Sequence, residues 1–361
     1  MTPADLSSTV LHAVRRAVDE NALRAPVPAR VRVERTRPGG TGDYACAVAL
    51  QLAGPAGLPA REVARILRER VAAEPGIGRV EITGPGFLSF TLDAPADRDR
   101  AVLDAVRERG IAYGHGEALR NEELRFHHAR EVRAAVTADA VRRLLTAQGA
   151  RVRVGCEGEA EEWGRLGVSP DAYGPVAPED TVIRPVPAGA SAGELLERLG
   201  ADAARWGLLR PAAHDRAPLG DGLLVQGEAN PLFRVRYAHA RTRALTRGAA
   251  ALGFTSAPEA APYGPETAPY EPPARPLLDL LADHPGVLLA AARHRAPDRV
   301  ARQLEAVAHA FFDFHDCCPP LPSGDEKPSA AHRSRLALAE AAGTVLAGGL
   351  SLLGISAPAH L

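Results

Sequence analysis

Residues 230–245 read N-P-L-F-R-V-R-Y-A-H-A-R-T-R-A-L, and this segment constrains the fold more than any other. Pro231 suits the first turn of a helix, where the missing N–H costs nothing. At 3.6 residues per turn, one stripe of this helix is apolar and the opposite stripe is cationic. The sequence therefore predicts a helix that packs on one side and presents either a solvated or a phosphate-binding surface on the other. The apolar stripe comprises Val235, Ala238, Thr242 and Leu245, and the cationic stripe comprises Arg236, Arg243 and Arg247, with His239 at the border.

Arginine is so common in this chain that its clusters are weak evidence by themselves. Lysine and arginine together number 43, yet Lys327 is the only lysine. The formal net charge of −1 gives no overall basic field. Any nucleic-acid binding would therefore have to depend on local patches.

The cysteines and the apolar segments bear on the cellular compartment. Cys46, Cys156, Cys317 and Cys318 have no C-x-x-C spacing and no neighbouring histidine pair suited to zinc. We expect mostly buried thiols in a reducing compartment. The sequence has no signal-peptide pattern and no apolar run that approaches the length of a membrane span, so we predict a cytoplasmic protein without membrane contact.

The first 95 residues predict a small α+β domain. Apolar residues recur every four positions from Leu6 to Val18, which indicates a helix that begins at Pro3 with Thr2 as its cap. A second helix is expected after Pro59. The alternation over 80–82 and 88–92, around Gly84-Pro85-Gly86, predicts a hairpin with Phe87 in the core.

The C-terminal part predicts further helices. Residues 199–206 indicate a helix with a side-chain pair between Asp202 and Arg205. The proline-rich stretch 257–276 predicts an exposed loop, and helices are expected over 277–282 and 285–295 and from Pro297 onward. The phenylalanines at 311, 312 and 314 are typical of a core rather than of a stacking platform.

Several of these strings resemble arginyl-tRNA synthetases. Asn230-Pro231 and the run 237–241, Y-A-H-A-R, are similar to N-P-V-Y-Y-V-Q-Y-A-H-A-R, which opens the anticodon-binding domain of that family. Phe233 and Arg234 stand where the family has tyrosines, and Arg236 replaces its glutamine. Residues 42–44 (G-D-Y) and 84–87 (G-P-G-F) are similar to the amino-terminal extension, and the ending L-G-I-S-A-P resembles the end of the family's sequences. The resemblance implies a tRNA partner.

The middle of the chain resembles the family's catalytic core only in part. Residues 139–145 (D-A-V-R-R-L-L) match a family string, and His128 then occupies the first position of its His-x-Gly-His motif. Arg130 and Glu131 replace the glycine and the second histidine, and a carboxylate there would repel a phosphate. Trp163-Gly164 resembles the family's Asp-Trp-Gly. No lysine-bearing signature loop is possible, and the proline-rich link over 169–192 is too short for the missing strands and helices.

We therefore predict an α+β protein that binds tRNA, arginine tRNA by resemblance, and does not activate an amino acid by itself. The predicted parts are an α+β amino-terminal domain (1–95), a degenerate α/β connector (96–198) and an all-α helical-bundle anticodon-binding domain (199–361). Two alternatives stay open: a residual or partner-dependent arginine–tRNA ligase, and a protein-interaction module built from synthetase domains. No cofactor is expected unless ligase activity survives, in which case ATP is needed, and we expect a monomer. The predicted tRNA-binding residues are Arg234, Arg236, Tyr237, His239, Arg241, Arg243 and Arg247, and the catalytic remnants are His128 and Trp163.

Overall fold

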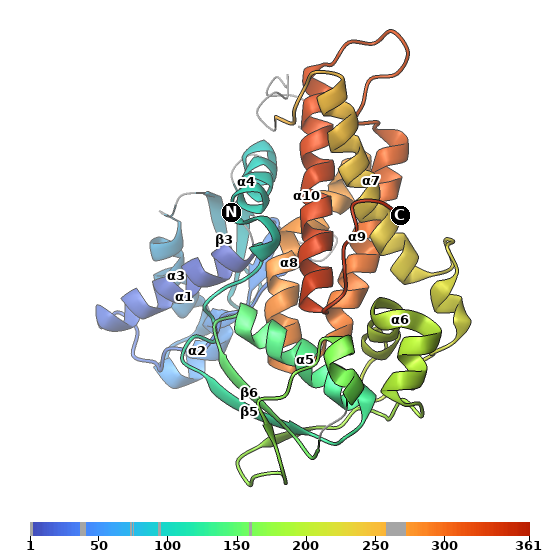
Figure 1. Cartoon of the computed structure of the whole chain (residues 1–361). Helices are drawn as coiled ribbons and strands as arrows, with labels where there is room; N and C mark the ends of the chain where they lie inside the picture. Colours follow the sequence, from blue (N-terminus) through green and yellow to red (C-terminus); the bar gives the residue numbers. More distant parts are fainter. Residues whose placement is uncertain are drawn as a thin grey trace. The chain divides into compact units, whose positions relative to one another are not determined.

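A computed structural model of the chain describes residues 3–36, 41–72, 74, 76–92, 95–158, 161–257 and 272–361 (Figure 1). It contains two compact units, one formed by residues 1–104 and one by the described residues from 105 onward. Thr2, residues 38–40 and most of the proline-rich stretch 257–276, with Tyr263 and Tyr270, lie outside the described residues.

The first unit is a four-stranded antiparallel sheet with three helices. The strand order is β1-β2-β4-β3. Leu6, Val10, Leu67 and Phe90 lie in its core, each with 0% exposure. The predicted helices and hairpin are confirmed, whereas α2 and β2 were not predicted. The elements are α1 (Pro3–Asp19), β1 (Val33–Arg35), β2 (Tyr44–Cys46), α2 (Val48–Ala56), α3 (Ala60–Val71), β3 (Ile77–Thr83) and β4 (Phe87–Leu92).

The family-like landmarks of this unit have structural functions. Gly42 has a φ of +78°, and a Cβ there would lie 2.7 Å from the carbonyl oxygen of Phe90. The Asp43 carboxylate accepts a hydrogen bond from the backbone N–H of Leu92 (3.0 Å). At Gly86 a Cβ would lie 2.9 Å from the backbone of Ala60. The prediction of Phe87 as a core residue was wrong, because it begins β4 next to the turn and is 36% exposed.

The second unit begins with a parallel sheet of order β7-β6-β5-β8. The sequence predicted a link without strands over 169–192, but β7 and β8 lie within it. Strands this short show no alternation, and they join the edges of β6 and β5 through backbone pairing. The elements are α4 (Pro95–Arg109), which links the two units along the chain, η1 (Gly110–Ala112), β5 (Glu123–His128), α5 (Val132–Ala147), β6 (Arg151–Cys156), η2 (Glu161–Leu166), β7 (Ala172–Tyr173) and β8 (Thr181–Ile183).

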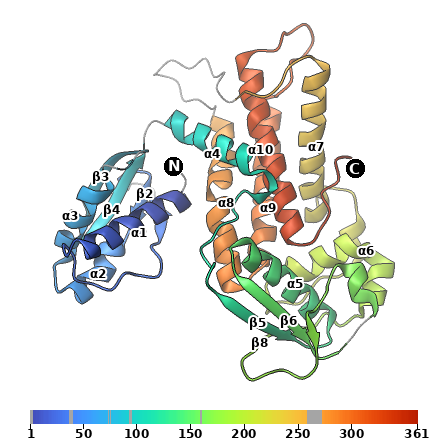
Figure 2. The same ribbon diagram turned by 60° about the vertical axis from the view of Figure 1, so that its left-hand side comes forward.

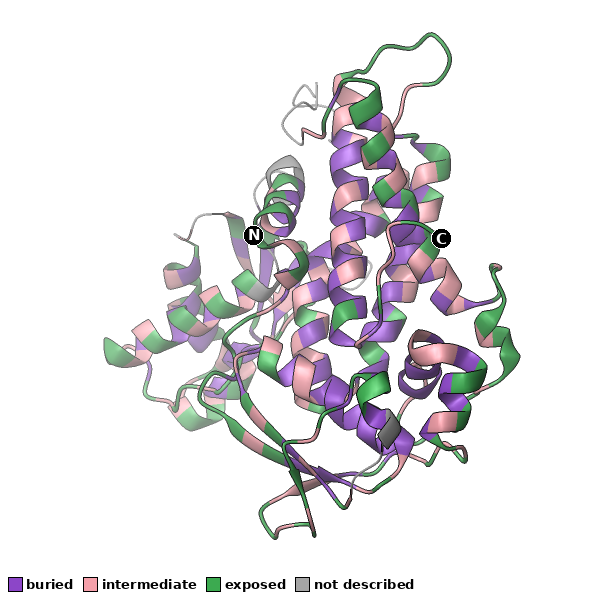
Figure 3. Ribbon diagram, in the orientation of Figure 1, coloured by how far each residue is buried: buried purple, intermediate pink, exposed green. Residues whose placement is uncertain are grey.

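The rest of the second unit is helical. Helix α10 contacts α7, α8 and α9, and burial is concentrated on the sides that these helices turn toward each other (Figure 3). The predicted boundary at 198–199 falls inside α6, beside a break at Gly200 (φ 72°, ψ 171°), and α5 of the connector contacts α6, α8 and α10. The elements are α6 (Ala192–Leu209), η3 (Asp221–Leu224), α7 (Pro231–Ala251), η5 (Pro272–Ala274), α8 (Arg275–His294), α9 (Asp298–Cys317) and α10 (Ala330–Leu352).

Two local predictions in this unit were wrong. The helices expected on either side of Pro285 form one helix, α8. Proline removes the N–H that would bond the carbonyl of Leu281, and the Tyr113 hydroxyl donates to that carbonyl instead (3.1 Å). The predicted Asp202–Arg205 pair forms no hydrogen bond or salt bridge among the described contacts, because Asp202 accepts a hydrogen bond from the Ser356 N–H (3.0 Å) and Arg205 bonds Asp139 (2.8 Å).

Most thiols of the described part are buried, as predicted. Cys46, Cys156 and Cys318 are buried and Cys317 is exposed. Burial raises the pKa of the Cys46 thiol to about 11. None of the described helices is long and apolar enough to cross a membrane. The described residues contain no cluster of three histidine, cysteine or acidic side chains suited to a metal ion.

Candidate nucleic-acid interface

Helix α7 begins where the sequence predicted. The side-chain oxygen of Asn230 accepts hydrogen bonds from the N–H groups of Leu232 (3.1 Å) and Phe233 (3.4 Å). Its amide nitrogen donates to the carbonyls of Leu223 (2.8 Å) and Val225 (2.9 Å). Asn230 therefore caps the helix and also holds the preceding loop against it. The predicted apolar stripe is confirmed, since Val235, Ala238, Thr242 and Leu245 are at most 4% exposed.

The C-terminal tail of the chain lies along one side of α7 and engages part of the predicted cationic stripe. Arg236 donates to the Ser356 hydroxyl (3.2 Å) and lies 3.5 Å from the Asp202 carboxylate. His239 is 6% exposed, and its Nδ1 lies 3.0 Å from the carbonyl oxygen of Pro358. Burial lowers the pKa of His239. These two side chains thus hold the tail and are not open on the surface.

Arg247 extends the same contact. Its guanidinium donates to the carbonyl of Ala359 and to the ring of His360, both at 3.4 Å. These distances are long for hydrogen bonds of this kind. Arg247 is exposed, so it can exchange the tail for another acceptor.

Two further predicted residues meet helix α9. Arg234 donates to His309 (3.0 Å), and the exposed Arg241 donates to His315 (3.4 Å). Tyr237 is 44% exposed, but its ring is stacked between Phe233 and Phe312, with both pairs of ring centroids 5.6 Å apart. The tyrosine ring therefore already packs against two aromatic rings of the protein.

Arg243 differs from the other predicted residues of α7. It is exposed and has no hydrogen bond or ion pair with any residue that the structure describes. It borders a hollow of about 450 Å³ between α7 and α10. The other side chains at this hollow are mainly polar and include His239, Thr242, Thr246, Glu340 and Thr344. Arg243 is the cation of α7 that is most available for an anionic ligand.

The predicted catalytic remnants lie in the interior. His128 is 0% exposed, and its ring centroid lies 5.3 Å from that of Trp163, which is 4% exposed. Nδ1 of His128 lies 2.8 Å from the carbonyl oxygen of Ala129, and burial lowers the pKa of the ring. The structure thus brings the two remnants together, but as packed side chains.

The N-terminus of α5 is closed by the chain itself. Glu131 is the cap residue, and its carboxylate accepts hydrogen bonds from the N–H groups of Ala134 (2.8 Å) and Ala188 (2.9 Å). The second bond brings the proline-rich linker onto the helix end. Arg133 is 1% exposed and fixes the same region. Its guanidinium donates to the carbonyls of Val186, Leu208, Pro211, Ala212 and Asp215.

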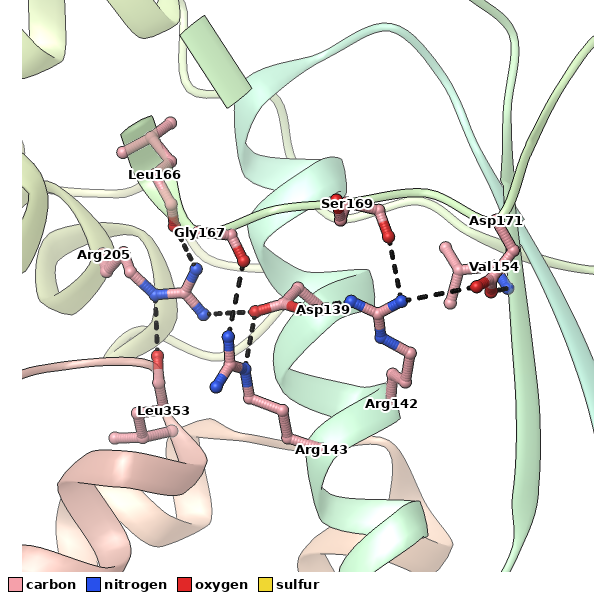
Figure 4. A network of polar contacts seen from close by, with 10 residues as sticks. All are labelled: Asp139, Arg142, Arg143, Val154, Leu166, Gly167, Ser169, Asp171, Arg205 and Leu353. Atoms are coloured by element: carbon pink, nitrogen blue, oxygen red, sulfur yellow. Dashed lines mark hydrogen bonds and ion pairs between the residues drawn. The ribbon is translucent and has the colours of Figure 1, made fainter. Parts of the chain in front are cut away.

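A buried ionic network centres on Asp139 of α5 (Figure 4). Its carboxylate accepts hydrogen bonds from Arg205 (2.8 Å), Arg143 (2.8 Å) and Arg142 (2.9 Å). Burial alone would raise the pKa of Asp139, but the two guanidinium groups of Arg205 and Arg143 outweigh it and lower the pKa. Arg205 also donates to the carbonyl of Leu353 at the end of α10 (2.8 Å). The network therefore ties the connector to the helical bundle.

Comparisons with protein-family models find synthetase domains at both ends of the chain. The family model described as "Arginyl tRNA synthetase N terminal domain" matches residues 5–92, and the one described as "DALR anticodon binding domain" matches residues 235–361. A protein of Frankia alni named "Arginine--tRNA ligase" is 29% identical over 559 residues, with 100% of both chains covered. The chain is thus similar to arginyl-tRNA synthetases at both ends and over its full length.

Two further comparisons also find arginyl-tRNA synthetases. A protein of Renibacterium salmoninarum with the same name is 28% identical, with 100% of both chains covered. The Thermus thermophilus arginyl-tRNA synthetase structure has a TM-score of 0.67 at 14% identity and covers 100% of both chains, which shows a shared fold. The alignment with the Frankia protein has 559 positions and this chain has 361 residues, so a long part of that alignment has no residue of this chain opposite it.

The sequence did not predict the buried arginines or the contact of the tail with α7. Arg205 was predicted to pair with Asp202, and Arg133 was not distinguished from the other arginines of the chain. The matching strings D-A-V-R-R-L-L and L-G-I-S-A-P could have indicated the network, because Asp139 lies in the first and Arg205 bonds the residue that begins the second. Nothing in the sequence indicated that the tail lies on α7.

Proposed function

We propose that this protein binds tRNA and does not activate an amino acid by itself. The observation that carries the second part is the closed N-terminus of α5. A helix N-terminus at the carboxyl end of a parallel strand is where such folds hold phosphate groups. Here the Glu131 carboxylate and the backbone of Ala188 occupy that end, and a triphosphate does not fit beside a capping carboxylate without repulsion.

The RNA-binding part is supported by the family of the two end domains and by the exposed cations of α7. Arg243 has no described partner, and Arg241 and Arg247 make only long contacts. Guanidinium groups of this kind bind phosphate oxygens, which dominate the affinity for nucleic acids. We expect the main contacts from Arg243, Arg241 and Arg247, with Arg236 and His239 acting through the tail.

A titration of the full chain with total tRNA at several salt concentrations tests the RNA-binding part. Binding should weaken steeply with salt, and Arg243→Ala should reduce the slope of log K against log salt by about 1. Arg120→Ala is the matched control, because Arg120 is an exposed arginine paired with Glu117 in the connector. Absence of a complex at low salt, or equal effects of the two variants, argues against RNA binding at α7.

The second candidate function is arginine–tRNA ligase activity, and the names of the full-length relatives favour it. It requires ATP to bind near β5 and α5 in spite of Glu131. Arginine-dependent exchange between pyrophosphate and ATP, measured on the purified chain with tRNA present, separates the candidates. Exchange above background establishes the ligase and rejects the first proposal. Its absence, with tRNA binding intact, leaves the first proposal standing.

A further inference from the structure

One face of the parallel sheet in the second unit has no helix on it. Along β5 and β6 the side chains alternate, with Phe126 and Val154 buried at 1% and 3% exposure. Among the described elements of this unit, Figure 2 shows α5 on one side of β5, β6 and β8, and only connecting loop on the other. Parallel sheets are usually covered on both faces and apolar on both. This second face is instead polar, and it carries a hollow of about 530 Å³ whose lining includes Arg125, His127 and Arg153 together with Asp171 and Asp180.

Two arginines at this hollow occupy neighbouring positions on adjacent strands. Arg125 and Arg153 are paired in the register of β5 and β6, so their backbones are only about 4.8 Å apart. Like charges in such positions repel each other. Arg125 is neutralised by Glu179, with the two charged groups 2.7 Å apart. Arg153 has no ion pair or hydrogen bond with any described residue, and it is exposed.

A buried histidine borders the same hollow. His127 is 3% exposed, its Nδ1 lies 3.8 Å from the Asp180 carboxylate, and its Nε2 has no partner among the described residues. Buried polar atoms nearly always have a partner. The ring lies over Gly155 of the neighbouring strand, where a Cβ would come within 3.0 Å of Nδ1. The position of the ring therefore depends on a glycine at 155.

We propose that this hollow binds a phosphate ester, with its phosphate on Arg153 and Arg125 and with His127 Nε2 as a further hydrogen-bonding partner. A phosphate has oxygens for several donors from different directions, and the guanidinium fork matches them. The Asp180 carboxylate can accept from a hydroxyl or amino group of the same molecule. The volume lies within the usual range for small-molecule sites. The phosphate can belong to a free metabolite or to RNA, and the site is independent of the function proposed for α7.

Calorimetric titration of the full chain with AMP, and separately with inorganic phosphate, tests the site. Arg153→Ala should weaken AMP binding by about tenfold, the effect of losing a charge-assisted contact. Arg151→Ala is the matched control, because Arg151 lies on the same strand and the same face but is paired with Glu123. The control should leave AMP binding unchanged. Absence of saturable binding of AMP and phosphate, or equal affinities of Arg153→Ala and the unaltered chain, overturns the proposal.

An NMR titration of the unaltered chain tests the contact with His127 directly. The Cε1–H NMR signal of His127, assigned by its loss in His127→Gln, should shift on addition of AMP. An unmoved signal at saturating AMP overturns the proposed contact.

Competition with tRNA identifies the source of the phosphate. Displacement of AMP by tRNA indicates an RNA phosphate, and no displacement indicates a free ester; both retain the site. Arg243→Ala should leave AMP binding unchanged, so failure of RNA binding at α7 and failure of this site are distinguishable.

Discussion

Helices α5 and α7 are both rich in polar and charged side chains, but they use them in opposite ways. On α5, Arg133 and Asp139 are at most 2% exposed, and each makes several hydrogen bonds within the protein. On α7, Arg241 and Arg247 are exposed and make contacts of 3.4 Å, and Arg243 makes none with the described residues. The comparison teaches that the polar side chains of α5 form a structural joint, whereas α7 keeps cations available for a ligand.

The largest effect is expected at the centre of the joint. Asp139→Asn leaves Arg205, which is 1% exposed, without its counter-charge and should lower the free energy of unfolding by about 3–5 kcal/mol. Urea denaturation followed by circular dichroism measures it. Arg143→Ala is the control, since this partner is 38% exposed and should cost less. If Asp139→Asn lowers the free energy of unfolding by less than about 0.5 kcal/mol, the polar contacts of α5 contribute as little to stability as the exposed arginines of α7.

Low pH should weaken the same ionic network around Asp139. The pKa of Asp139 is lowered in the folded state in spite of burial, which alone would raise it, because Arg205 and Arg143 stabilise the charged form. A carboxyl whose folded pKa lies below its unfolded value contributes stability above the unfolded value and loses it as pH falls through the folded value. The stability difference between the unaltered chain and Asp139→Asn should therefore shrink on acidification below the ordinary aspartate pKa.

A buried histidine of α8 is expected to give the next largest effect. Burial, and then the neighbouring His115, lower the pKa of His284 to about 4. With an unfolded value near 6.5, the folded state loses up to about 3 kcal/mol as pH falls from 6.5 through 4, because only the unfolded chain readily takes up the proton. His284→Phe keeps a ring against Tyr113 (6.1 Å between centroids) and should flatten the unfolding free energy over this range. An unchanged pH profile would show that His284 is not the titrating group.

A substitution at Gly354 tests the contact between Arg205 and the residues that follow α10. Gly354 has a φ of +70°, and a Cβ there would lie 2.4 Å from the Arg205 guanidinium. Gly354→Ala should lower the free energy of unfolding by about 2–3 kcal/mol, from strain and displacement of Arg205 together. Gly253→Ala isolates the strain, since Gly253 has a similar φ of +74° with nothing within 4 Å of the added atom. Equal costs at both glycines would remove Arg205 from the explanation.

The smallest stability effects are expected on α7. Arg241→Ala and Arg243→Ala should change the free energy of unfolding by less than about 0.5 kcal/mol, as is usual for exposed side chains without strong partners. Thermal and urea unfolding measure this, with tRNA affinity as the second readout. Substitutions on α7 that destabilise as strongly as Asp139→Asn would make these arginines structural as well, and the contrast between the two helices would disappear.

The local features of α7 could be predicted because they depend on near neighbours. Asn230 and Pro231 fix the start of the helix, and the spacing from Val235 to Leu245 fixes its buried side. The same approach was wrong at Pro285, where a hydroxyl from Tyr113 satisfies the freed carbonyl. It was also wrong at Asp202, whose partners come from residues more than 30 positions away along the chain. Contacts between distant segments leave no periodic pattern.

The sequence by itself determined the family-like strings and the order and type of most elements, because each of these is written in consecutive positions. Only the tertiary structure decided which arginines are buried, that the linker covers the end of α5, that the tail lies on α7, and that one sheet face carries a polar hollow. The physical reason is that the energy of a charged group depends on its burial and on the groups placed around it. Those surroundings come from segments that meet only when the chain folds.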